Sequence, residues 1–185
     1  FLPGVVVSLP AGAIARRFGD KRLVLLGLAL MTFGAAVCAL AGSDAALAAG
    51  RVISGIGGVI LNVVMSKMVV DWFTGREVVL GMAIFVNSFP IGVGLAMLTL
   101  GAISAHAGWQ VAMGSVAVAT AAALIAVWAW CEPHPNDAEL TGAKTMGSVS
   151  LTRDELRLVS VAGAIWGIFN GCFAVLFGFA APLLM

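Results

Sequence analysis

Long apolar runs without charged residues recur along this chain, and they constrain its fold more than any other feature. Residues 23–40 carry no charge, and the 185 residues together are 61% hydrophobic and only 10% charged. A helix needs roughly 20 mostly apolar residues to cross a bilayer core about 30 Å thick. In lipid, only helices and closed barrels satisfy every backbone hydrogen bond, and uninterrupted apolar runs favour helices. The sequence therefore predicts an all-α membrane protein, a bundle of several spanning helices.

Six apolar segments, separated by five polar connections, predict one partial helix followed by five fuller helices. The last connection, residues 132–157, is the longest, and its prolines are typical of a linker. Thr152 and Glu155 have the spacing of a capping box, which predicts that the final helix starts near them. Because both ends of the chain fall inside apolar segments, we expect a piece of a longer protein, truncated at both ends. The predicted helices cover residues 1–15, 23–41, 45–70, 78–104, 109–131 and 158–185.

The basic residues fall in alternate connections. All of the ten Lys and Arg residues except Arg51 lie in or beside residues 16–22, 71–77 and 132–157, and the other two connections have none. Because Lys and Arg collect on the cytoplasmic side of membranes, we expect these three connections to be cytoplasmic in a multi-pass protein of a bacterial inner membrane. The net charge of +1 gives no indication of nucleic-acid binding.

The connection at residues 16–22 carries the most distinctive motif of the chain. Together with Gly12 it resembles the loop signature G-x-x-x-D-R-x-G-R-R of the major facilitator superfamily. Arg16 stands where the family usually has Asp, and Asp20 stands where the family usually has a base. In the family that Asp locks the cytoplasmic side against the other half of the molecule, so the resemblance implies a gating loop. Its motif residues are Gly12, Arg16, Arg17, Gly19, Asp20, Lys21 and Arg22.

The helix lengths and the long final connection resemble the same family. By this resemblance, residues 1–131 correspond to helices two to six, residues 132–157 to the central cytoplasmic loop, and residues 158–185 to helix seven, which opens the C-terminal half. The implied protein is a bundle of the major facilitator type that moves a small-molecule substrate across the lipid bilayer by alternating access. Protons are a candidate coupling ion. Residues 89–94 also resemble cyanate-permease-like members.

Arg51 is the first candidate for the substrate or proton pathway, because it is charged and lies about two turns inside a predicted helix. Inserting such a charge costs at least a few kcal/mol. The glycines that follow it resemble a family signature in helix four, whose Arg is associated with proton transfer or substrate handling. A structural alternative stays open, in which Arg51 reaches the interface or pairs with Asp44. Because this deep charge is positive, an anionic substrate is the hypothesis.

Arg51 shares one helix face with Gly55, Gly58 and Asn62, since successive residues turn by about 100°. A face made of a charge, two missing side chains and an amide is unsuited to lipid. It is predicted to line a cavity or to pack against a neighbouring helix, because small residues allow close approach. For Asn62 both roles stay open.

The predicted helix at residues 78–104 is interrupted by Pro90, which predicts a kink. Asn87 lies one turn before this proline, and Gly92 and Gly94 follow it. A bent packing helix is favoured here over a wall of the cavity. Asn87 is nevertheless retained as a candidate pathway residue.

The last predicted helix has Gly163, Gly167 and Gly171 at every fourth position, which predicts tight helix contact. Trp166 and Asn170 are also four residues apart and so lie on neighbouring parts of the helix. The two side chains either hold a small solute or serve as an interfacial aromatic and an interhelical hydrogen bond. Both interpretations stay open.

The sequence suggests no catalytic centre, cofactor or metal site. All nine Asp and Glu residues lie in connections or at predicted helix ends, and both His residues lie in connections. The three Cys residues are widely separated in apolar segments, which argues against a disulfide framework. An enzyme is therefore disfavoured. Two alternatives to a solute carrier remain: a drug/proton efflux antiporter of the same superfamily and a non-transporting receptor or scaffold.

Overall fold

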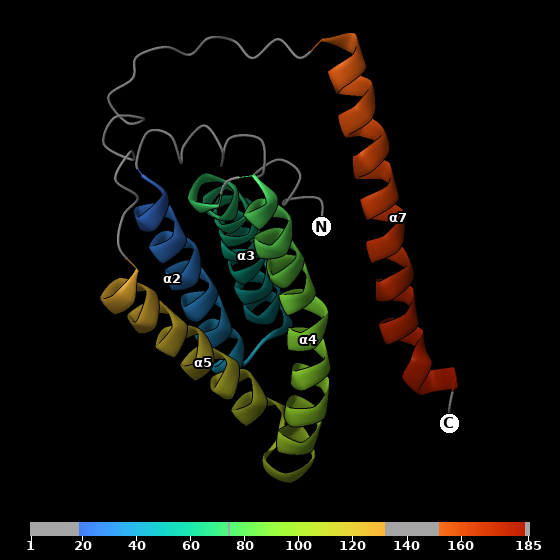
Figure 1. The fold of residues 1–185 in the computed structure, drawn as a ribbon. Coiled ribbons are helices and arrows are strands. Elements are labelled where there is room, and N and C mark those ends of the chain that lie inside the picture. Colours follow the sequence, from blue (N-terminus) through green and yellow to red (C-terminus); the bar gives the residue numbers. More distant parts are fainter. Residues whose placement is uncertain (1–18, 74, 132–151, 184–185) are drawn as a thin grey trace. The chain divides into compact units, whose positions relative to one another are not determined.

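The computed structural model describes residues 19–73, 75–131 and 152–183, and these ranges contain helices and no strand. The chain divides into two units, residues 1–143 and residues 144–185. Among the described helices, four belong to the first unit and one to the second (Figure 1). Their bounds are α2 (Asp20–Ala39), α3 (Asp44–Trp72), α4 (Arg76–Ala107), α5 (Trp109–Trp130) and α7 (Arg153–Leu183).

Helices α2, α3, α4 and α5 are each long and apolar enough to cross a bilayer. This confirms the prediction of an all-α membrane bundle. The predicted partial helix at residues 1–15 lies outside the described residues. Helix α7 has a shorter apolar stretch within its described part, residues 156–169.

The helices extend beyond the apolar segments at their charged ends. Helix α2 begins at Asp20 rather than at Leu23, and α7 begins at Arg153 rather than at residue 158. An acidic residue in the first turn is favoured by the helix dipole, so Asp20 extends α2. In α7 the N–H of Leu156 donates to the carbonyl of Thr152, which agrees with a helix start near the capping-box residues. Hydropathy therefore locates the apolar part of each helix but not the charged turns at its ends.

Glycines precede three of the described helices with a backbone that other residues rarely adopt, and Gly75 before α4 has φ of 59°. Gly108 is the single residue between α4 and α5, with φ of 88°, and Gly19 precedes α2 with φ of 83°. A side chain at either position would be strained, because positive φ is costly for residues with a Cβ. The motif glycine Gly19 is therefore explained by the turn into α2.

Helices α2 and α3 pack through four glycines at intervals of seven residues. A Cβ added at Gly34 would lie 2.6 Å from the carbonyl oxygen of Gly50, and one added at Gly57 would lie 2.5 Å from that of Gly27. Both distances are too short for real contacts, so these positions admit only glycine unless the helices separate. The seven-residue spacing is close to two helical turns and keeps the contact on one face of each helix.

Helix α2 contacts both α3 and α5, and α4 in turn contacts α3 and α5. Leu23, Val24 and Leu28 of α2 and Val64 of α3 form the buried core. Thr32 of α2 and Thr120 of α5 join their hydroxyl groups at 3.2 Å. Among the described residues, α2 therefore supplies three of the four residues of this core. Partly buried residues that surround it are Ile60, Leu61, Met65, Met68, Ala123, Leu124 and Val127.

Candidate functional site

A cluster of three charged residues joins the start of α2 to the end of α3. The Lys67 ammonium lies 2.5 Å from the Asp20 carboxylate and 2.8 Å from that of Asp71. Asp20 is only 3% exposed. A buried carboxylate is costly unless it is paired and hydrogen bonded, and Lys67 supplies that pairing. Removing the ammonium would therefore leave a buried, uncompensated charge in the gating motif.

The same end of the unit includes the end of α5. Lys21 Nζ donates to the main-chain carbonyl of Trp128 at 3.3 Å. The start of α2, the end of α3 and the end of α5 therefore lie at one end of the four helices. The described residues 19–22 and 71–73 therefore lie at this end, as does Cys131, which follows α5. This arrangement agrees with the alternation of basic residues, while the membrane side on which they lie stays a prediction.

Only part of the predicted gating motif is described. Gly12, Arg16 and Arg17 lie outside the described residues, whereas Gly19, Asp20, Lys21 and Arg22 lie at the start of α2. Asp20, which departs from the family pattern, is the buried member of the charged cluster. Lys21 and Arg22 stand at the surface of the same helix end. The gating role of the motif stays a prediction.

Arg51 is exposed on α3, seven residues after the helix begins at Asp44. At 1.5 Å per residue this places its Cα about 10 Å along the helix. Asp44 is also exposed, and within the described ranges no ion pair joins it to Arg51. A pairing with Asp44 is therefore not seen among the described residues, and the alternative in which Arg51 reaches the interface stays open.

Helix α3 has two chemically distinct faces. Gly50, Gly57 and Val64 are buried at seven-residue intervals and define the packing face, which meets α2. The polar face consists of Arg51, Gly55, Gly58 and Asn62, all exposed or partly exposed. By the helical angle it lies about 80–140° around the axis from Gly50.

The glycines of the polar face do not make the close contacts found on the packing face. In the described part of the chain, a Cβ at Gly55 would meet nothing within 4 Å, and one at Gly58 would meet only the Met31 sulfur at 4.0 Å. Close helix packing at these two glycines is therefore not seen within the first unit. The close packing occurs at Gly50 and Gly57 instead, and sequence reasoning missed both.

Helix α4 continues through Pro90 from Arg76 to Ala107. Asn87 is exposed, and its side-chain amide donates to the carbonyl of Ala83 in the same helix at 2.8 Å. Among the described residues, a Cβ at Gly92 or Gly94 would meet nothing within 4 Å. Their roles in a kink, in packing or in a solute pathway stay predictions.

The candidates on α7 belong to the second unit. Gly163, Gly167 and Gly171 have nothing within 4 Å of an added Cβ among the described residues. The side chains of Trp166 and Asn170 lie outside the described part, although their backbone is helical. Their roles stay predictions.

Lys67 and Asp71 are the functional candidates that sequence reasoning missed. Their spacing of four residues within a helix is a signal for an ion pair, and it could have marked them. The partner Asp20 is 47 residues away along the chain, and no local pattern identifies it. In the described ranges, no group of three or more His, Cys, Asp or Glu residues could hold a metal ion.

Comparison with known proteins identifies the family. The family model of the Major Facilitator Superfamily matches residues 1–185. Two solved structures of a mutant peptide transporter, POT, have TM-scores of 0.62 with bound alafosfalin and 0.63 in a second structure, each at 23% identity. They align with 94% and 95% of this chain, which spans 36% of the length of each. No curated protein matches it. Because the family model covers every residue, the chain belongs to the Major Facilitator Superfamily.

Proposed function

We propose that this chain is part of a secondary transporter, and that the polar face of α3 borders the pathway of a small anionic solute. The observation that carries this proposal is the exposed guanidinium of Arg51 on a helix that can span the membrane. A charge at such a depth is stable only beside water, protein or a solute. Family membership supports transport by alternating access between two helical bundles.

The surroundings of Arg51 favour an aqueous pathway over lipid. Within the described ranges, Gly55 leaves space beside the helix, and Asn62 lies further along the same face. A guanidinium offers several N–H donors in a fixed geometry that suits carboxylates and other oxyanions. The resemblance of residues 89–94 to cyanate-permease-like members points to the same class of small anion.

The division of the chain follows from the same proposal. Residues 1–131 belong to the first half of the transporter, residues 132–157 form the central loop on the cytoplasmic side, and the last segment opens the second half. The charged cluster of Asp20, Lys67 and Asp71 fastens α2 to α3 at the proposed cytoplasmic end. This fastening lets the two helices move as one body when the transporter changes its state.

The proposal is tested by uptake into proteoliposomes that contain the full-length protein. Wild type, Arg51→Ala and Arg51→Lys are compared for small inorganic anions, organic acids and neutral solutes. Hydrogen bonds to charged groups contribute about 1.5–3 kcal/mol, so saturable anion uptake should fall roughly 10- to 100-fold in Arg51→Ala. Arg51→Lys should retain part of it. The control Arg153→Ala removes an exposed charge from the start of α7 and should transport normally.

The possible outcomes separate the candidate functions. Anion uptake that is unchanged in Arg51→Ala would refute the role of Arg51 in the pathway. Proton flux driven by amphipathic drugs, without anion uptake, would favour an efflux antiporter. Binding of a solute without any flux would favour a receptor or scaffold.

A further inference from the structure

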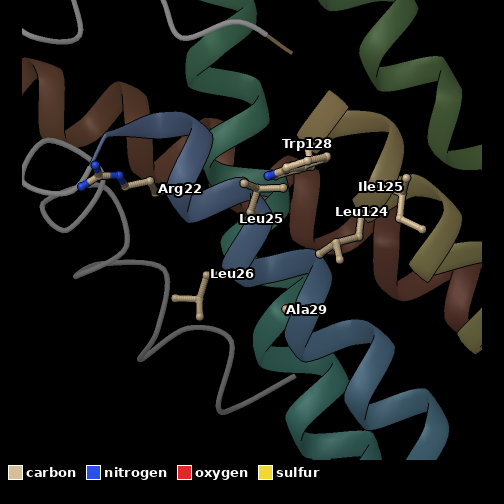
Figure 2. A pocket seen from close by; sticks show the side chains of 7 residues that line it. All are labelled: Arg22, Leu25, Leu26, Ala29, Leu124, Ile125 and Trp128. Atoms are coloured by element: carbon tan, nitrogen blue, oxygen red, sulfur yellow. The ribbon is translucent and has the colours of Figure 1, made fainter. Parts of the chain in front are cut away.

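An apolar groove with a cation at one end lies between α2 and α5 (Figure 2). Its volume is about 500 Å³, and it is open along the surface of the two helices. In Figure 2, Trp128 extends from α5 toward α2. The lining residues are Arg22, Leu25, Leu26 and Ala29 of α2, and Leu124, Ile125 and Trp128 of α5.

The lining combines aliphatic side chains with one charge and one aromatic side chain. Leu26 is 49% exposed, Ile125 is 62% exposed and Trp128 is 68% exposed. Exposed apolar side chains on a spanning helix suit contact with acyl chains, because the bilayer core contains no water. Trp residues favour the level of lipid headgroups, because the indole is apolar with one polar N–H. The groove thus changes from apolar to polar toward the end of α5.

Two cations stand at that polar end. Arg22 is exposed, and within the described ranges no ion pair joins it to a carboxylate. Lys21 donates to the carbonyl of Trp128, which places a second positive charge at the same end. The described residues that line the groove include no acidic side chain. The local charge therefore complements an anion that lies at the membrane surface.

We propose that this groove binds one anionic phospholipid. The lipid phosphate contacts Arg22 in the field of Lys21, because a guanidinium forms strong paired hydrogen bonds with phosphate oxygens. One acyl chain lies along Leu25, Leu26 and Ala29 of α2 and along Leu124 and Ile125 of α5. Basic pockets between spanning helices are a known type of site for anionic headgroups. This inference does not depend on which solute the protein transports.

The test uses the fluorescence of Trp128 in the full-length protein, with every other Trp replaced by Phe. The protein is placed in phosphatidylcholine vesicles with increasing fractions of brominated phosphatidylglycerol, or of brominated phosphatidylcholine as the zwitterionic comparison. Bromine quenches Trp at contact distance. We expect phosphatidylglycerol to quench at a lower fraction, with a preference of about fivefold for each cation.

Two variants and a control separate the headgroup contact from the acyl contact. Arg22→Gln should lower the preference for phosphatidylglycerol about fivefold. Ala29→Phe should fill the groove and reduce quenching by both lipids, and it alters an exposed position outside the buried core. The control Arg153→Gln removes a charge that does not line the groove and should leave the preference unchanged.

Three results would overturn the proposal. Equal quenching by the two lipids in the wild type would show that the groove does not recognise the headgroup. Absence of quenching at every lipid fraction would show that another part of the protein fills the groove. An equal loss of preference in Arg22→Gln and Arg153→Gln would show a general effect of surface charge instead of a site.

Discussion

The packing face and the polar face of α3 use glycine for opposite purposes. At Gly57 an added Cβ would lie 2.5 Å from a carbonyl oxygen of α2, whereas at Gly55 it would meet nothing within 4 Å among the described residues. On the packing face the missing side chain allows two backbones to approach each other. On the polar face it leaves space beside Arg51. The comparison teaches that spacing alone does not reveal what a glycine in a membrane helix does.

Replacing glycine by leucine on the two faces should give the largest difference in the free energy of unfolding. Gly57→Leu forces a branched side chain against the backbone of α2, so we expect a loss of about 3 kcal/mol or more, with little folded protein. Gly55→Leu should change the free energy of unfolding by less than about 0.5 kcal/mol, while filling the space beside Arg51 and lowering uptake. Thermal unfolding of the full-length protein in detergent measures the first effect. Equal destabilisation by both variants would refute the distinction between the faces.

The charged cluster offers the next contrast, between its buried and its exposed carboxylate. Asp20→Asn should destabilise the protein by about 1–3 kcal/mol, because a charge-assisted hydrogen bond at a buried site is lost. Asp71→Asn should cost only about 0.3–0.5 kcal/mol, since its side chain is 34% exposed and its pair lies within one helix. Denaturant unfolding curves of the two variants measure both losses in the free energy of unfolding. A larger loss for Asp71→Asn would contradict the assigned burial.

Two adjacent residues of α3 lie in different surroundings. Leu61 packs against the core, and Asn62 lies on the polar face. Leu61→Ala should lower stability by about 1–2 kcal/mol, less than a fully buried leucine would. Asn62→Ala should leave stability within about 0.5 kcal/mol and raise the KM of uptake. Unfolding assays should therefore respond mainly to Leu61→Ala, and uptake assays mainly to Asn62→Ala. The reverse result would refute the placement of Leu61 at the core and of Asn62 on the polar face.

The hydrogen bond between Thr32 and Thr120 should contribute less than the losses expected at Gly57, Asp20 and Leu61. Interhelical hydrogen bonds in membranes contribute about 0.6 kcal/mol on average. A double-mutant cycle with Thr32→Val and Thr120→Val should give a coupling energy of this size. A coupling near zero would show that α5 is held to α2 by packing alone.

The extent of the described helices α2, α3, α4 and α5 could be predicted from sequence, because lipid requires long apolar segments. The helices predicted at residues 23–41 and 109–131 have ends within three residues of the observed ends of α2 and α5. The helix starts at Asp20 and Arg153 were harder to predict, because charged residues beyond the apolar core continue the helix. Capping patterns helped only at Thr152.

The pairing of elements could not be predicted from local patterns. Asp20 pairs with Lys67 because two antiparallel helices bring distant residues to one end of the unit. Gly27 and Gly57 meet for the same reason. On each helix a second glycine lies seven residues away from the first. This spacing does not show which face of α3 meets α2. That Arg51 and Asn62 share a face was predictable, since both lie on one helix, and the role of this face stays a prediction.

The most direct test of the account is the accessibility of the polar face of α3 in the full-length transporter. Single cysteines at positions 55, 58 and 62, with position 64 as the buried control, are treated with a membrane-impermeant thiol reagent after the native cysteines are replaced by Ala. We predict rapid labelling at the first three positions, slowed by a transported anion, and none at the control. Unlabelled cysteines at all three positions, or labelling that no solute slows, would contradict a solute pathway along α3.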